Sequence, residues 1–237
     1  MSVHDGHRQR LKERFRKEGL DNFDELYVLE LLLFYCVPRQ DTNPLAHRLL
    51  DHFGSLVKVL EATPEELEKV PGVNQGISTF FALRAAVDKY YSIRKSLQTK
   101  KPAYTMEDCK QILSKRYLYE RNEKVCILSL DAKCGLISCE EVGEGCVNSA
   151  NVPIRRIVEM ALVSKATFLV VAHNHPSGIA IPSPEDVQAT QRLADALAAV
   201  EIYLADHFIF ARNDFVSLAE AGYYRPLYRL NPIIKEI

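Results

Sequence analysis

The sequence predicts an α+β protein, with a small helical domain followed by a domain in which helices pack on a mixed central sheet. The first observation is a change of pattern along the chain. Residues 1–95 carry helical periodicity and helix caps, whereas apolar runs of strand length begin after residue 105. The second is the stretch between them, which is polar, basic and poor in large apolar side chains. We therefore expect a helical domain at 1–95, a linker at 96–104 and a second domain at 105–237.

The N-terminal domain is predicted to consist of several helices. The run FDELYVLELLLFYCV has apolar residues on more than one face, as a helix within a core does. The segment TPEELEKV fits a capping box, in which Thr63 caps the helix and Glu66 follows three residues later. The turn PGVNQG then leads into the long helical pattern ISTFFALRAAVDKYYSI.

The C-terminal domain is predicted to mix strands and helices. EKVCILSLD reads as a buried strand, and TFLVVAHNH, apolar on both faces, is expected in the centre of its sheet. VPIRRIVEMALVSKA is helical in pattern, and so is SPEDVQATQRLADALAAV, with Ser183 as its cap and Pro184 at its first position. Such a mixture favours a sheet with helices packed on it.

The composition is that of an ordinary globular protein. The 237 residues are 47% hydrophobic and 26% charged, with a formal net charge of −1, so the overall charge indicates neither nucleic acid nor a membrane surface. The longest apolar stretches are far too short to span a bilayer, and the charged start lacks a signal-peptide core. We therefore expect a cytoplasmic protein without membrane contact. The spacing of Cys134, Cys139 and Cys146 fits no structural zinc site, which favours reduced thiols.

Two histidines, His173 and His175, stand at the end of the second predicted strand. Residues two apart on a strand point the same way, so both rings project from one face, at the strand end where open α/β sheets keep their sites. Asp186, in the first turn of the following helix, is the obvious third ligand of a divalent ion. Two imidazoles and one carboxylate leave a fourth position for water, as in catalytic zinc sites, where zinc lowers the pKa of that water.

These residues also have a plain structural interpretation. A histidine at a strand end is usually a surface or hydrogen-bonded residue, and H-x-H alone is a weak metal signal. The whole string H-x-H-P-x-G-x(4)-S-x-x-D is what favours metal binding. Ser183 has two compatible roles: capping the helix, and directing its hydroxyl at a reacting oxyanion.

The string from His173 to Asp186 resembles the JAMM (JAB/MPN) zinc metalloprotease motif, and the surrounding chain resembles the RadC family. This likeness is carried by GHRQRLKERF, ELLLFYCVPRQDTNPLAHRLLDHFGSL, VPGV, EEVGEGCVN, AHNHPSG and DHFIFA, which cover nearly the full chain. The resemblance implies a deaminase-like α-β-α fold for the C-terminal domain and zinc bound by His173, His175 and Asp186. It also implies a helix-hairpin-helix domain at the N-terminus.

The resemblance further implies a glutamate, on a strand well before the histidines, that takes a proton from the zinc water and passes it to the leaving amine. Glu123, which opens EKVCILSLD fifty residues before His173, matches that place. Glu144, in VGEGCV, is the alternative, and either could instead be a solvated carboxylate at a strand edge. Asp206 and His207 begin another strand, where His207 is either a further ligand or hydrogen-bonding partner of the site, or part of a local hydrogen-bonded pair.

The segment ELEKVPGVNQGISTFFALR resembles a helix-hairpin-helix, whose Gly-hydrophobic-Gly turn exposes backbone N–H groups to a phosphate. In the triplet Gly72-Val73-Asn74, asparagine replaces the second glycine, which puts close phosphate approach in doubt. The basic start HRQRLKERFRK is the better electrostatic candidate, although it equally fits a solvated helix face. Any DNA binding is expected to be non-specific and sensitive to salt.

The first functional hypothesis is a zinc-dependent hydrolase of the JAMM type that acts on an amide bond, peptide or isopeptide, of an unknown protein or peptide substrate. The alternative is a non-enzymatic DNA-associated module linked to DNA repair or recombination, with a structural or vestigial zinc site. Nucleobase deamination is disfavoured, because a zinc deaminase needs a C-x-x-C pair that this chain lacks.

Overall fold

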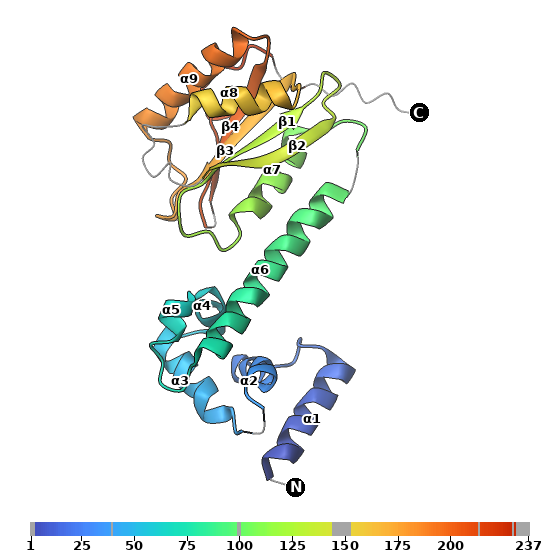
Figure 1. Ribbon diagram of the computed structural model, residues 1–237, viewed down its shortest axis with the longest axis vertical. Helices are drawn as coiled ribbons and strands as arrows, with labels where there is room; N and C mark the ends of the chain where they lie inside the picture. Colours follow the sequence, from blue (N-terminus) through green and yellow to red (C-terminus); the bar gives the residue numbers. More distant parts are fainter. Residues whose placement is uncertain are drawn as a thin grey trace. The chain divides into compact units, whose positions relative to one another are not determined.

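The computed structural model describes residues 3–38, 40–98, 101–143, 153–212, 214–228 and 230 (Figure 1). They belong to two compact units, Met1–Asp88 and Lys89–Ile237. The first unit is helical and the second contains a five-stranded sheet, which confirms the α+β class and the helical N-terminal region. None of the described helices has the length and apolar character that crossing a lipid bilayer requires.

The helices of the N-terminal unit pack around a main apolar core and a smaller apolar cluster of Leu11, Leu31 and Phe34. They are α1 (Val3–Glu18), α2 (Glu25–Cys36), α3 (Asn43–Phe53), α4 (Leu56–Glu61), α5 (Pro64–Leu67) and the start of α6 (Gln75–Gln98). α2 is apolar on several faces because it lies within this core, where Leu29 and Leu33 are fully buried. The capping box predicted at the start of α5 is present, since Thr63 and Glu66 each accept the other's backbone N–H.

α6 continues past the expected end of the helical domain. The sequence placed a linker at 96–104, but residues 96–98 still belong to α6, and the division between the compact units falls earlier, after Asp88. The physical reason is that Leu97 packs against an apolar cluster of the second unit, so this turn of helix has a buried side.

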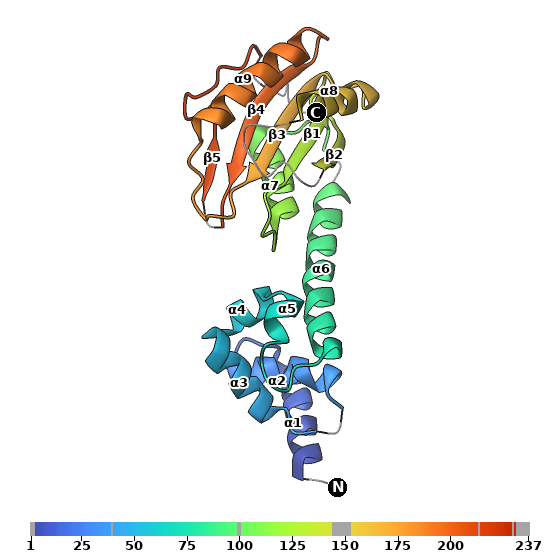
Figure 2. The ribbon, with the colours of Figure 1, turned by 60° about the vertical axis from the view of Figure 1, so that its left-hand side comes forward.

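The sheet of the second unit has the strand order β2-β1-β3-β4-β5 (Figure 2). Its strands are β1 (Val125–Leu130), β2 (Leu136–Gly143), β3 (Phe168–Asn174), β4 (Tyr203–Phe210) and β5 (Phe215–Ser217). β3 and β4 run parallel while the other neighbours are antiparallel, so the sheet is mixed. As predicted, the strand that ends in the histidine pair is central.

Helices cover both faces of this sheet. α8 (Ile154–Val163) and α9 (Pro184–Ala198) lie on one face, and α7 (Met106–Ser114), followed by a short 3-10 turn at Lys115–Tyr117, lies on the other (Figure 1). Alternation along β3 sends Leu169 and Val171 into the cluster under α8 and α9, and Val170 and Ala172 into the cluster under α7. His173 continues the first series, which directs its ring toward the α9 side.

A buried carboxylate fastens the last strand to β4. Asp206 Oδ1 accepts hydrogen bonds from the backbone N–H groups of His207 (2.7 Å) and Ala219 (3.0 Å), and its Oδ2 accepts from the Ser217 hydroxyl. Burial raises the pKa of Asp206 to about 6, although these hydrogen bonds favour the charged form. The hydrogen bonds of Asp206 are thus local. A local hydrogen-bonded pair was one of the two interpretations that the sequence allowed for Asp206 and His207.

The raised pKa of Asp206 predicts a pH-dependent stability. Because the folded pKa lies above the unfolded value, the stabilising contribution is complete below about pH 4 and is lost as the pH rises through about 6. Between these limits, the free energy of unfolding of the wild type should fall by up to about 3 kcal/mol more than that of Asp206→Asn. Urea unfolding of the chelator-treated protein, followed by circular dichroism, measures the difference.

The exposed Asp195, on α9, supplies the control. Asp195→Asn should retain the wild-type dependence on pH. Parallel pH curves for the wild type and Asp206→Asn would contradict the assigned ionisation.

Candidate metal centre

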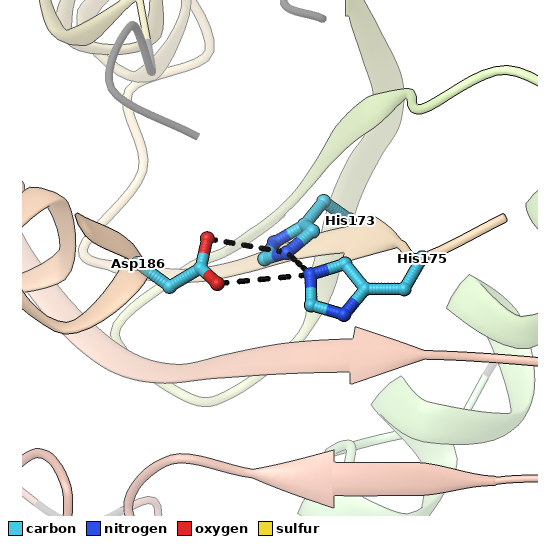
Figure 3. A group of neighbouring side chains, drawn as sticks. All are labelled: His173, His175 and Asp186. Carbon is cyan, nitrogen blue, oxygen red and sulfur yellow. Dashed lines mark hydrogen bonds and ion pairs between the residues drawn. The ribbon is translucent and has the colours of Figure 1, made fainter. Parts of the chain in front are cut away.

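The side chains of His173, His175 and Asp186 converge (Figure 3). The two histidine Nε2 atoms are 2.9 Å apart, and the carboxylate oxygens of Asp186 lie 3.4 Å from His173 Nε2 and 3.6 Å from His175 Nε2. One ligand atom from each residue falls within 4.8 Å of the others, which is close enough for all three to hold one metal ion. Within the described part of the chain, this is the one such group of His, Cys, Asp and Glu residues.

Two elements of the fold bring the three residues together. His173 is the penultimate residue of β3, and His175 follows the strand with its backbone N–H donated to Phe210 of β4 at 2.7 Å. Asp186 belongs to the first turn of α9 and is almost completely buried. His175 is the most open of the three, with 18% of its side chain exposed, so an approaching molecule reaches the site from its side.

The start of α9 is built around Asp186. Asp186 Oδ2 accepts hydrogen bonds from Ser183 N (2.8 Å) and Ser183 Oγ (2.7 Å), and Asp186 N donates to Ser183 Oγ (3.1 Å). This capping box confirms Ser183 as the helix cap. It also occupies Oδ2 with two donors, and leaves Oδ1, which faces His173, to meet a cation. Because the single hydroxyl proton of Ser183 is donated to Asp186, its role toward an oxyanion stays a prediction.

A chain of hydrogen bonds determines which nitrogen of His173 carries the proton. The Thr190 hydroxyl donates its only proton to the Asp186 carbonyl oxygen at 2.6 Å, so Thr190 Oγ1 must accept the 2.6 Å hydrogen bond from His207 Nδ1. His207 Nε2 is then unprotonated and accepts from His173 Nδ1 at 2.8 Å. His173 therefore presents the lone pair of Nε2 to the site.

His175 reaches the same state through a shorter connection. Its Nδ1 lies 3.0 Å from the carbonyl oxygen of Ile179, which can only accept, so Nδ1 carries a proton and, in the neutral ring, Nε2 presents a lone pair. The Nε2 atoms of the two rings face each other across 2.9 Å beside a buried carboxylate. With both rings neutral, this arrangement is repulsive unless a proton or a metal cation lies among the three groups, and two imidazoles with one carboxylate form the donor set of catalytic zinc sites.

Burial keeps the imidazoles of His173 and His207 uncharged at neutral pH. It lowers the pKa of His173 to about 4, a shift that Asp186 opposes and His175 reinforces. It also lowers the pKa of His207 well below its ordinary value, with smaller contributions from His173 and His175. Metal ligation requires neutral imidazoles, so these rings are in the required form at neutral pH. Both nitrogens of His207 are occupied by hydrogen bonds, which makes it a partner of His173 rather than a ligand.

Glu123, the predicted acid–base residue, lies two residues before Val125 of β1, which pairs with His173. It is partly buried. Burial raises the pKa of Glu123, His175 lowers it and Asp186 raises it. Its role in catalysis stays a prediction. Glu144, the alternative, lies outside the described residues.

The comparisons with known proteins agree with this architecture. A family model described as a RadC-like JAB domain matches residues 103–223, which contain the whole sheet and the three clustered residues. The chain belongs to the RadC family. A UPF0758 protein of Fusobacterium nucleatum is 33% identical to this RadC-family chain over 224 residues, which cover 92% of the chain and 96% of that relative. A UPF0758 protein of Ruegeria pomeroyi is 33% identical over 217 residues, with the same coverage.

The sequence analysis missed two residues around the site of this RadC-family chain. Thr190 is one; it lies four residues after Asp186 and thus on the same face of α9, a spacing that could have indicated it. Asn174 is the other; it stands between the two histidines, and its side chain bonds to the backbone before β1. The cysteines expected as reduced thiols include Cys134 and Cys139, whose pKa values burial raises, whereas Cys146 lies outside the described residues.

The turn at residues 71–74, which the sequence offered as a nucleic-acid site, makes hydrogen bonds with side chains of the N-terminal unit. Gly72 has a φ of +97°, as such a turn requires, and Arg48 Nε donates to the neighbouring Pro71 carbonyl at 2.9 Å. Asn74 Oδ1 accepts the Ile77 N–H at 3.1 Å, so Asn74 caps α6. This N–H is already occupied, and a phosphate would have to compete with the Asn74 side chain for it. Val73 lies between them, its N–H donated to Val70. DNA binding by this turn and the helix-hairpin-helix assignment stay predictions.

Two of the basic residues at the start of the chain have partners within the N-terminal unit. Arg8 donates to backbone carbonyls after α2, including that of Gln40 at 2.6 Å. Arg14 donates to the Asn22 carbonyl at 2.6 Å and its guanidinium stacks on Phe23. These side chains hold α1 to neighbouring segments, which leaves fewer of their N–H groups available to donate to a phosphate.

The hydrogen-bond chain behind His173 predicts that Thr190→Val weakens metal binding about tenfold. Without the hydroxyl acceptor, the His207 tautomer with its proton on Nε2 becomes the more stable one. His207 then donates to His173 Nδ1, and His173 must carry its own proton on Nε2, the nitrogen that faces the metal. Zinc affinity, measured by competition with a chromophoric chelator, tests this. Gln191→Ala, which changes the exposed residue next to Thr190, is the control and should keep the zinc affinity of the wild type. Equal zinc affinities in the wild type, Thr190→Val and Gln191→Ala would contradict the mechanism.

Proposed function

We propose that this RadC-family chain is a zinc-dependent hydrolase that cleaves an amide bond, peptide or isopeptide. The observation that carries the proposal is the convergence of two imidazole Nε2 atoms, 2.9 Å apart, with the carboxylate of Asp186. Hydrogen bonds behind both rings hold them in this orientation, which directs both Nε2 atoms to the place where a cation would bind.

The donor set suits zinc. His173 Nε2, His175 Nε2 and Asp186 Oδ1 would bind it, and the exposed edge of His175 leaves one side of the site accessible. Zinc held by three protein ligands supplies a fourth position for water and lowers the pKa of that water toward neutrality.

Glu123 is proposed as the general base and acid. A carboxylate beside the site accepts a proton from the attacking water and then donates it to the amide nitrogen, which leaves as an amine. Partial burial raises the pKa of Glu123, which makes its protonated form easier to reach at the second step. The choice of an amide as substrate follows from the family resemblance and from this need for leaving-group protonation.

The proposal predicts one zinc per chain, lost on removal of any ligand. Asp186→Ala should reduce zinc affinity by more than the roughly 10- to 100-fold that loss of an outer partner causes. Elemental analysis of protein purified with zinc measures the stoichiometry. Asp195→Ala changes an exposed carboxylate of the same helix and should keep one zinc per chain. Full zinc occupancy after loss of Asp186 would remove the basis of the site.

The proposal also predicts that Glu123→Gln retains zinc but loses about 100- to 10,000-fold in rate. The assay follows hydrolysis of a defined panel of linear peptides, terminally blocked peptides and lysine isopeptides by mass spectrometry. Glu185→Gln, an exposed change beside Asp186, is the matched control and should keep the wild-type rate. A zinc-loaded wild type that cleaves none of the panel, or a fully active Glu123→Gln, would argue against the mechanism.

A further inference from the structure

Asn174, the residue between the two histidines, has hydrogen-bond partners that differ from theirs. Asn174 is 5% exposed, and its side-chain amide reaches the segment that leads into β1. Its Oδ1 accepts the backbone N–H of Lys124 at 2.9 Å, and its Nδ2 donates to the backbone carbonyl of Asn122 at 3.0 Å. The two contacts lie on either side of Glu123.

The strand register shows why a side chain makes these contacts. The antiparallel pairing of β1 with β3 ends at Val125 and His173, and the segment before Val125 is no longer a strand. A carboxamide carries one acceptor and a donor, as a peptide group does, so the Asn174 side chain continues the pattern of the ladder one step beyond the last strand pair. The backbone of Asn174 meanwhile pairs with Phe210 of β4.

The same segment is held from its other side by charge. The ammonium of Lys124 lies 3.4 Å from the Glu120 carboxylate and 3.3 Å from the Glu141 carboxylate of β2. These ion pairs direct the Lys124 side chain toward β2. Glu123 lies two residues before Val125, which is the partner of His173 in the sheet. The backbone at residues 122–124 is therefore fixed on both sides of Glu123, next to the end of β3 that carries the histidines.

We propose that Asn174 is a positioning residue, whose amide clamps the backbone around Glu123 and so holds the Glu123 carboxylate at the metal centre. This inference rests on the proposed function, because it gives Glu123 its purpose. The amide chemistry is specific: aspartate lacks the donor for Asn122, alanine lacks both groups, and glutamine carries them one methylene farther from the backbone. The residue that separates the two ligands thus connects them to the acid–base group.

The first test needs neither metal nor substrate. In the metal-free full chain, Asn174→Ala should speed hydrogen exchange of the Lys124 amide at least about tenfold, because that N–H loses its acceptor. NMR spectroscopy of the exchanging amides measures this rate. Asn74→Ala is the matched control, since it removes a similar side-chain acceptor from Ile77 in the N-terminal unit and should leave Lys124 at the wild-type rate. Unchanged Lys124 exchange in Asn174→Ala would show that there is no clamp.

The second test reads the metal centre without substrate. Cobalt(II) replaces zinc in sites of this kind and absorbs visible light, and the pH midpoint of its spectral change responds to charges at the site. Glu123→Gln and Asn174→Ala should each move this midpoint, in the same direction and by about one pH unit. The double variant should move it no further than Glu123→Gln alone, because both changes remove the same carboxylate from its place. Asn174→Gln, which retains the polar side chain if alanine impairs folding, should shift it by a smaller amount.

The outcomes separate the two proposals. If Glu123→Gln shifts the cobalt midpoint and Asn174→Ala does not, the clamp is refuted while the role of Glu123 stands. If Glu123→Gln leaves the midpoint unchanged, the proposed function fails and the positioning role fails with it, whatever the exchange rates show. Additive shifts in the double variant would mean that Asn174 acts on the metal centre by another route.

Discussion

The candidate metal centre depends on two imidazole rings whose Nε2 atoms face each other at 2.9 Å beside Asp186. Left to themselves, two such rings would turn apart or share a proton. Here the Ile179 carbonyl holds one ring, and Thr190 with His207 holds the other. Burial makes protonation of His173 costly, so a proton is a poor substitute for a metal cation at neutral pH. The surrounding fold keeps this unfavourable arrangement in place.

Much of this could be predicted from the sequence, because local rules govern it. Strand alternation places His173 and His175 on one side, and Ser183 and Pro184 define the start of the next helix, which gives Asp186 its place in the first turn. The central position of β3 follows from apolar residues on both of its faces. In each case the information lies within a few residues of the feature it determines.

The remainder depends on contacts between segments that are far apart in the sequence. Thr190 is an ordinary helical residue until His207 of β4 is packed against it, and Asn174 has no evident purpose until the segment before β1 lies beside it. The continuation of α6 through residues 96–98 has the same cause, since the packing of Leu97 within the second unit cannot be read from a polar, basic stretch. A single sequence therefore indicates the candidate metal-binding residues but does not indicate the hydrogen bonds that other segments of the chain make with them.

The capping box at α9 has a consequence for folding. Asp186 closes the first turn of its helix through Oδ2 and faces the histidines through Oδ1, so one carboxylate belongs to both structures. If the three residues bind a metal as proposed, fraying of that turn would separate them, and metal binding would in turn protect the turn from fraying. The segment between His175 and Ser183 would then be held at both ends by the same centre, and its order would depend on metal binding.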